Sequence, residues 1–302
     1  MIEAYEATRS PRLLQAIERA LRYLVGELIV DAPDAPLSFV IEANGELKLG
    51  ASAAAILALV KYSEIRKTTK YHDLLERLAL GIVHMQDPAS GAFSHVLNYP
   101  SLEVKDPFRI IYYDGEAAFG LMRLFGLTRD ARWLEAVERA FVHFLKAEHW
   151  KAHDHWLAYA ANELAKHCPK AKYFEFGIRN VEDYLDFVRL RITTFPTLLE
   201  LMMATGLLLE AMQGKSPQDL LGRLDLEAFH LSAKARAFSL LNGYFWPELA
   251  MFFEAPGKIV GSFFIRHHAF RIRIDDVEHY LSGLVAFLGY LQKHGPAMRA
   301  VG

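Results

Sequence analysis

A repeated helix start decides the fold: Leu49-Gly50-Ala51-Ser52-Ala53-Ala54 returns 65 positions later as Asp114-Gly115-Glu116-Ala117-Ala118. Each start leads into an apolar helix, a short polar turn, an aromatic residue and a second helix. The second helices match at Glu76-Arg77 and Glu138-Arg139, 62 positions apart, so the second copy has three residues fewer in its turn. A weaker third copy runs from Trp156 to Tyr184. Repeated helical hairpins form either an open solenoid or a closed ring.

The length of the repeat favours the ring. Its period of about 60 residues exceeds that of tetratricopeptide and HEAT units, and the extra residues lie in loops between hairpins. Small residues at the helix starts suit close packing of inner helices. Apolar residues at three- and four-residue steps predict helices at about 11–30, 50–67, 70–86, 115–127, 130–148, 154–166, 173–191, 196–213, 228–245 and 275–293. The sequence therefore predicts an all-α toroid of five or six helical pairs.

Two short segments interrupt the helical pattern. Asn44-Gly45 lies between the apolar runs 38–42 and 46–49 and favours a two-residue type I′ hairpin turn. Residues 92–104 look extended, and residues 251–274 alternate apolar and polar side chains around Pro256-Gly257. We therefore expect two small β-hairpins over one mouth of the ring.

The composition of the 302 residues excludes several classes of protein. Lys and Arg number 34 against 36 Asp and Glu, a net charge of −2, so we expect no nucleic-acid partner. The lone Cys168 excludes an intrachain disulfide and a Cys-rich zinc site. The polar, acidic residues 1–9 are unlike a secretory signal, and no apolar window is long enough for a membrane span. The cytoplasm is therefore the expected location.

Two stretches resemble a known superfamily. Tyr112-Tyr113-Asp114-Gly115-Glu116-Ala117 and Trp133-Leu134-Glu135-Ala136 are typical of the repeats of α/α-toroid proteins, especially the carbohydrate-active (α/α)6 barrels. The pattern covers residues 10–293. The resemblance implies a single toroid domain of residues 1–302, with a small-molecule or oligosaccharide substrate in its central cavity.

The first candidate cluster is Tyr112-Tyr113-Asp114-Gly115-Glu116, at a loop-to-helix junction. Its carboxylates are candidates for acid–base catalysis if a partly closed cavity shifts their pKa values, and its tyrosines are candidates for sugar stacking. A structural alternative is that Asp114 caps the helix and Glu116 complements its dipole.

A second cluster, His153-Asp154-His155-Trp156, lies at another helix entrance. His155, Tyr159 and Glu163 recur every four residues and share one helix face. Ligand contact and a solvated helix edge both fit this face, and Asp154 fits an N-cap.

The third cluster combines Arg266-His267-His268 with Arg271, Arg273, Asp275 and His279. The arginines are suited to a carboxylate or sulfate group of a substrate. The alternative is an Arg–Asp network that ties the last helix to the first.

We predict a glycoside hydrolase or a sugar epimerase (an isomerase) that acts on an anionic glycan. Glu116 and Asp275 are the predicted acid and base, with His155 and His279 as second candidates. The predicted substrate-binding residues are Tyr112, Tyr113, Asp114, Trp156, Arg271 and Arg273. The alternatives are a non-catalytic helical-repeat scaffold and another toroid chemistry, prenyl transfer or peptide cyclisation.

A metal site receives less support from the sequence. His153, His155, Asp275 and His279 are reasonable ligand types, but the sequence contains no HExxH motif and no compact run of three ligands. We therefore expect neither a metal nor another cofactor.

Overall fold

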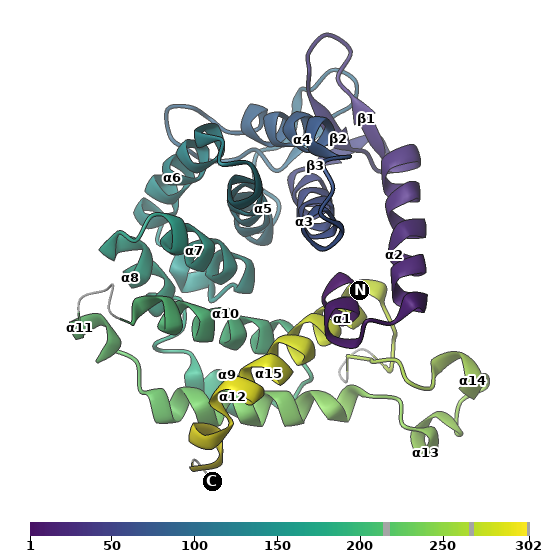
Figure 1. Ribbon diagram of the computed structural model, residues 1–302, viewed down its shortest axis with the longest axis vertical. Helices are drawn as coiled ribbons and strands as arrows, with labels where there is room; N and C mark the ends of the chain where they lie inside the picture. Colours follow the sequence, from purple (N-terminus) through teal and green to yellow (C-terminus); the bar gives the residue numbers. More distant parts are fainter. Residues whose placement is uncertain (214–217, 266–268, 301–302) are drawn as a thin grey trace.

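The computed structural model describes residues 1–213, 218–265 and 269–300, and its helices form two concentric rings (Figure 1). The inner ring consists of α1 (Ile2–Thr8), α3 (Leu49–Arg66), α5 (Tyr112–Thr128), α7 (His155–His167), α10 (Thr197–Met212) and α15 (Ile274–Ala300). The outer helices are α2 (Pro11–Tyr23), α4 (His72–His84), α6 (Ala131–Lys146), α8 (Ala171–Arg179) and α12 (Leu226–Leu240). Each inner helix from α3 to α15 contacts the next, and α1 contacts both α15 and α3. The predicted toroid is confirmed.

The core fills the space between the two rings. The outer helices bury one face, as α6 does with Trp133, Val137, Phe141 and Phe144. The inner helix α10 is apolar on nearly every side and buries most of its length. This difference is expected, because an outer helix meets water on one face whereas an inner helix is enclosed by its neighbours. Among the described residues, no helix combines the length and the apolar run needed to cross a bilayer.

Small residues allow the inner helices to approach closely. A Cβ atom on Gly115 would lie 2.5 Å from the backbone nitrogen of Leu157, which is far inside contact distance. A Cβ atom on Gly50 would overlap a carboxyl oxygen of Glu116. The repeated glycine of the helix starts thus lies at the α3–α5 and α5–α7 contacts, as predicted.

The strands form two small antiparallel sheets. One pairs β1 (Ile29–Asp31) with β2 (Ser38–Val40). The other has the order β3-β4-β5, from Glu46–Lys48, Val96–Asn98 and Val104–Asp106, with Leu47 opposite Leu97. The extended segment predicted at 92–104 therefore contains β4 and the start of β5.

The turn at Asn44-Gly45 differs from the predicted type I′ form. The Gly45 N–H donates to the Glu42 carbonyl (2.9 Å), and Gly45 has a φ of 78°. The turn is thus a longer one with a left-handed glycine at its end, a form that also connects antiparallel strands. The two segments that flank the turn are joined by a single bridge, between Ile41 and Leu47. Their strands have other partners, since β2 pairs with β1 and β3 pairs with β4.

Two predicted elements are wrong. The hairpin around Pro256-Gly257 is absent from the described part of residues 251–274, where α14 (Pro256–Ile259) follows α13 (Pro247–Ala250). Proline favours the first turn of a helix, and the alternating apolar side chains pack on a small separate core around Phe245 and Phe264. The helix predicted at 173–191 breaks after α8, because buried Asn180 is used to hold the start of α7, and resumes as α9 (Leu185–Leu190).

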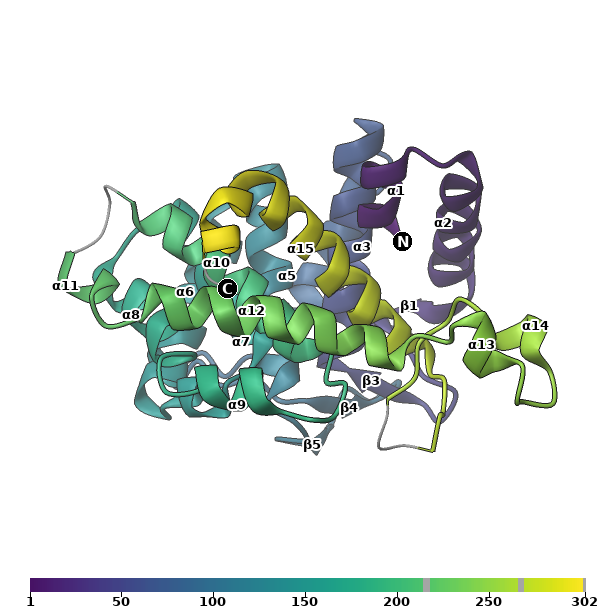
Figure 2. The same cartoon turned by 90° about the horizontal axis from the view of Figure 1, so that it is seen from below.

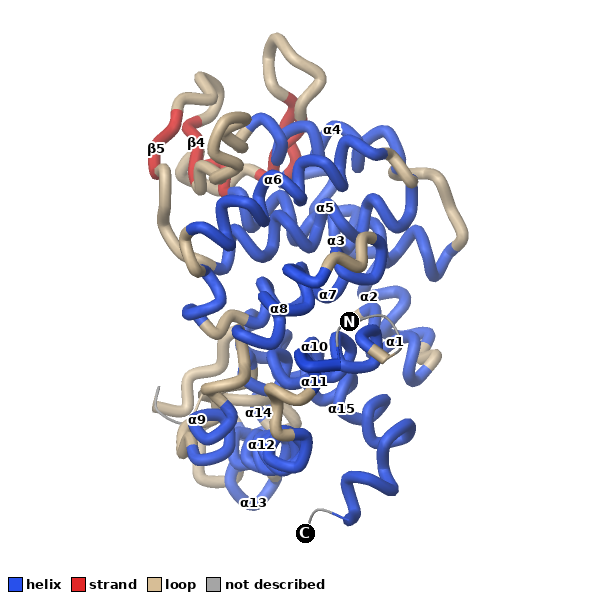
Figure 3. The backbone as a smooth tube through the Cα atoms, turned by 90° about the vertical axis from the view of Figure 1, so that its left-hand side faces the viewer, coloured by secondary structure: helices blue, strands red, loops and turns tan. Residues whose placement is uncertain are grey.

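The connections that run from an outer helix to the next inner helix contain the sheets, the short helix His149–Ala152, α9 and α13–α14. The connection from α10 to α12, which contains α11 (Gln218–Leu221), runs instead from an inner helix to an outer one. Figures 2 and 3 show β4, β5 and α9 on one side of the molecule. The first turns of the long inner helices therefore face one mouth, which we call the loop-side mouth.

Candidate active site

The loop-side mouth brings together ionisable groups from four inner helices. Glu116 comes from the second turn of α5, His155 from the start of α7, Glu200 from the first turn of α10, and His279 from the second turn of α15. Since these helices start at the same mouth, residues in their first two turns lie at a similar depth. The ring thus gathers residues that are up to 163 positions apart in the chain.

Asp154 caps α7 and lies beside the ring of His155. One Asp154 carboxylate oxygen accepts from the Leu157 N–H (2.9 Å) and caps α7, while the other lies 3.2 Å from Nδ1 of His155. Asn180 holds the same residue through its side chain, which accepts from the Asp154 N–H (3.1 Å) and donates to the Asp154 carbonyl (2.8 Å). His155 is 3% exposed, and its Nε2 lies 3.8 Å from the Glu200 carboxylate.

Glu200 and His279 form a close pair. Oε2 of Glu200 lies 2.7 Å from Nδ1 of His279, and Glu200 is 1% exposed. Burial favours the neutral imidazole, but the hydrogen bond to Glu200 and its charge outweigh burial and raise the pKa of His279 to about 9. The imidazole is therefore protonated at neutral pH, in the absence of any other cation.

Glu116 has the most perturbed carboxyl group of the mouth. Burial raises its pKa to about 8, and the nearby negative charge of Asp154 acts in the same direction. His279 has the opposite effect, which is smaller. Glu116 thus keeps its proton at neutral pH, as a general acid must.

Asp114 lies behind the mouth rather than in it. It is 2% exposed, and its Oδ2 is 3.3 Å from Nε2 of His95. The Arg109 and Ile110 N–H groups donate to Nδ1 of His95 (2.9 and 3.2 Å), so the proton of this imidazole is on Nε2, facing Asp114. Asp114 makes no side-chain capping bond to α5. Its position indicates that it anchors α5 to the β4–β5 segment.

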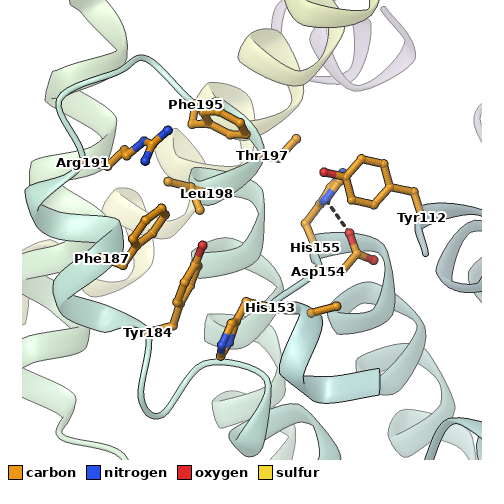
Figure 4. A pocket seen from close by; sticks show the side chains of 11 residues that line it. Tyr112, His153, Asp154, His155, Tyr184, Phe187, Arg191, Phe195, Thr197 and Leu198 are labelled. Atoms are coloured by element: carbon orange, nitrogen blue, oxygen red, sulfur yellow. Dashed lines mark ion pairs between the residues drawn. The ribbon is translucent and has the colours of Figure 1, made fainter. Parts of the chain in front are cut away.

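A pocket of about 130 Å³ opens beside His155 (Figure 4). Tyr112 and His155 face one side of it, and Tyr184, Phe187 and Arg191 line the other. The guanidinium carbon of Arg191 lies 5.1 Å from the ring centre of Phe187 and 5.5 Å from that of Phe195. The complete lining is Tyr112, Ala152, His153, Asp154, His155, Tyr184, Phe187, Arg191, Phe195, Thr197 and Leu198.

The C-terminal cluster lies at the edge of the mouth. Arg273 pairs with Asp275 and lies 4.0 Å from Asp276, and both Arg273 and Asp275 have half-exposed side chains. This ion pair is local to one segment and does not join α15 to α1. Arg271 is exposed, and Arg266-His267-His268 lies outside the described residues.

Several predicted site residues thus lie together, and others do not. Around the loop-side mouth the structure places Tyr112, Tyr113, Glu116, His155, Trp156 and His279. Asp275, Arg271 and Arg273 lie on the exposed start of α15 and the segment before it, and Glu163 pairs with Arg123 and His167 at the other end of α7. The roles assigned to the site residues, and the single-domain organisation, stay predictions.

Sequence reasoning missed Glu200, Glu278 and Arg191. Glu200 is a lone acid in an otherwise apolar helix, and that isolation was the available signal. Arg191 stands four residues from both Phe187 and Phe195, a spacing that indicates cation–π contact. His155, Glu200 and His279 also form a group whose ligand atoms all lie within 4.8 Å of one another, so they are the residues best placed to hold a metal ion.

No protein-family model and no curated protein matches the chain. The solved structures that match the chain include two glycoside hydrolases. A glycoside hydrolase family 76 mannosidase from Bacteroides thetaiotaomicron VPI-5482 has a TM-score of 0.50 at 14% identity, and a family 76 glycoside hydrolase from a bovine strain of the same species has 0.48 at 16%. The matches cover 63% and 61% of this chain but only 57% and 44% of those proteins. The first likeness agrees with the toroid fold, and at this identity it shows the fold alone.

Proposed function

We propose that this protein is a carbohydrate-active enzyme of the glycoside hydrolase type, with its reaction at the loop-side mouth. The observation that supports this most is the convergence of Glu116, His155, Glu200 and His279 from four different inner helices. A helical-repeat scaffold has no need for such convergence. A dry prenyl-binding cavity is disfavoured by the same charged groups.

Glu116 is the proposed general acid. Glycoside hydrolysis needs one protonated carboxyl group for the leaving oxygen and a second carboxylate as base or nucleophile. Asp275 is the second carboxylate predicted from sequence, but its charge is paired with Arg273. We therefore prefer Glu278, whose charge interacts with Glu116 and which lies 3.4 Å from Nδ1 of His279.

The proposed substrate is an anionic oligosaccharide. Tyr112 and Trp156 offer aromatic faces next to His155, with ring centres 5.6 and 5.1 Å from the imidazole. Arg191, in the pocket wall, is a suitable partner for a carboxylate or sulfate group, because a guanidinium binds such groups through two hydrogen bonds. Arg271 and Arg273 stay candidates for the same role at the rim, and the cytoplasm stays the predicted compartment.

An epimerase is the second candidate. The imidazole rings of His155 and His279 have their centres 5.2 Å apart, so two proton-transfer groups face one small space. In this alternative the histidines remove and return a proton at a sugar carbon. Product analysis separates the two reactions, since only hydrolysis yields shorter chains.

Glu116→Gln tests the proposal directly. Purified protein is incubated with neutral and uronic-acid-containing oligosaccharides, and the products are separated by chromatography. We expect the variant to lose about 100- to 10,000-fold in kcat, because the amide has no proton to donate to the leaving group. The control is Glu76→Gln, an exposed carboxyl that pairs with Arg132 on the outer helices and should keep full activity. Unchanged turnover in Glu116→Gln would remove Glu116 from catalysis.

A further inference from the structure

We propose that His155, Glu200 and His279 form a binding site for one divalent transition-metal ion, with Zn²⁺ as the best-matched ion. The site needs no catalytic role for Glu116 and thus goes beyond the proposed function. If the site is occupied, both histidines are metal ligands rather than the proton carriers of the epimerase alternative.

The distances fit a three-ligand site. One ring nitrogen of each histidine and one carboxylate oxygen of Glu200 all lie within 4.8 Å of one another. The Glu200 carboxylate is 2.7 Å from His279 and 3.8 Å from His155. Two ligands that each bind a tetrahedral Zn²⁺ at about 2.1 Å are roughly 3.4 Å apart, a value between these two distances.

A second, independent observation that supports the metal site is an unpartnered nitrogen of His155. Its Nε2 is buried and has no hydrogen-bond partner among the described residues. A buried polar nitrogen without a partner costs about 1–3 kcal/mol, so such an atom calls for an explanation. This nitrogen faces Glu200 and the His279 ring, so a cation held between the three side chains would satisfy it.

Asp154 adds the outer shell that metal-bound histidines usually have. Its Oδ2 lies 3.2 Å from Nδ1 of His155 and, like Nε2 of His155, has no hydrogen-bond partner among the described residues. If a metal ion binds Nε2, the ring carries its proton on Nδ1, next to this oxygen. A carboxylate–histidine pair of this kind orients the ring and increases its basicity toward a metal. Asp154 is itself 2% exposed and fixed by Asn180 and the α7 cap.

The chemical types of the three ligands favour some metal ions over others. Two imidazoles and one carboxylate suit Zn²⁺ and its first-row neighbours, whereas Mg²⁺ and Ca²⁺ prefer oxygen ligands. Three protein ligands also leave a position for water or a substrate oxygen, as in catalytic zinc sites. Glu278, whose Oε2 is 3.4 Å from His279 Nδ1, is a further carboxylate beside the site.

The test is Zn²⁺ binding by the tag-free, full-length protein after treatment with EDTA, measured by calorimetry and by metal analysis after gel filtration. We expect one Zn²⁺ per chain and an affinity for Mg²⁺ at least about 100-fold weaker. Glu200→Gln and His279→Ala should each lower the Zn²⁺ affinity by at least about 100-fold. The control His84→Ala removes an exposed histidine of α4 and should bind as the wild type does.

Asp154→Asn tests the outer shell with less risk to folding, because asparagine also caps helices well. We expect it to weaken Zn²⁺ binding about 10- to 100-fold, the usual effect of changing a residue that contacts a metal ligand, with an unchanged circular dichroism spectrum. The proposal is wrong if the wild-type protein retains no Zn²⁺, the result expected if His279 only shares a proton with Glu200. It is also wrong if Glu200→Gln and Asp154→Asn bind as tightly as His84→Ala. Since no sugar is present, a negative glycoside assay leaves this result unaffected.

Discussion

Glu116 shows how one residue obtains its chemistry from the ring around it. Its carboxyl oxygen lies where a side chain on Gly50 would be, so α3 covers one side of it and leaves Glu116 only partly exposed to water. Asp154 and Glu278 add negative charge on the side of α7 and α15. The sequence identified Glu116 as a candidate from its place in a helix start, but these three neighbours are distant in sequence. The size of the pKa shift therefore depends on packing that no local pattern encodes.

This shift predicts how stability depends on pH. The unfolded chain loses the Glu116 proton near pH 4.5, while the folded protein keeps it up to about pH 8. The folded state thus binds more protons in this window, and its free energy of unfolding falls as pH rises from about 4.5 to 8. The full shift corresponds to at most about 5 kcal/mol, and solvent screening in the mouth lowers our expectation to about 1–2 kcal/mol.

Urea unfolding of the wild type and of Glu116→Gln across pH 4–9 measures this effect. The stability of Glu116→Gln relative to the wild type should increase over the window, because glutamine has no proton to lose. A constant difference between the two proteins at every pH would show that Glu116 has an ordinary pKa. The other charged groups of the mouth, including Asp154, Glu278 and His279, are the same in both proteins.

At the scale of helices and strands, the apolar spacing predicted the starts of the long inner and outer helices to within three residues. Their ends agree less well, since α12 stops at Leu240 instead of 245 and α15 runs to Ala300 instead of 293. The apolar spacing gave wrong predictions where contacts with distant residues determine the local structure. The predicted helix 173–191 breaks because Asn180 holds the start of α7, and the 251–274 segment folds on its own small aromatic core. The short helix α1 was missed because seven residues carry little periodicity. The strand pairing was also not predicted, because it joins segments that are distant in the sequence: β3 pairs mainly with β4, about 50 residues away.

The contact between α5 and α7 predicts a large effect for Gly115→Ala. The added methyl carbon would lie 2.5 Å from a backbone nitrogen of α7, so the two inner helices must separate. We expect a loss of about 1–3 kcal/mol in the free energy of unfolding, as overpacked cores show. Chemical denaturation measures it. In the matched control Gly289→Ala, nothing lies within 4 Å of the new carbon, so helix propensity alone should stabilise by about 0.5–1 kcal/mol. Equal stabilities for the two variants would contradict the close packing.

At the scale of the whole molecule, ring closure determines which residues meet. The repeat predicted the ring, and the ring implied that helix starts share a mouth. That reasoning placed Glu116, His155 and His279 in one region. It could not find Glu200 opposite His279, 79 positions away, because this pair depends on how α10 and α15 pack against each other. It could not find Arg191 in the wall of the pocket, because Arg191 lies in the loop between α9 and α10. The arginines and Asp275 of the C-terminal cluster were expected in the cavity but lie at its rim, since the pair Arg273–Asp275 is satisfied locally.

The proposed binding of an anionic carbohydrate at the loop-side mouth can be measured by thermal unfolding in the presence of oligosaccharides. A ligand at about 100 times its Kd stabilises the folded state by about 2.7 kcal/mol, which raises Tm measurably. We predict that uronic-acid-containing oligosaccharides raise the Tm of the wild type, and that Arg191→Met loses most of this shift while its own Tm stays near that of the wild type. An unchanged wild-type Tm with every neutral and anionic oligosaccharide would show that the loop-side mouth does not bind such sugars.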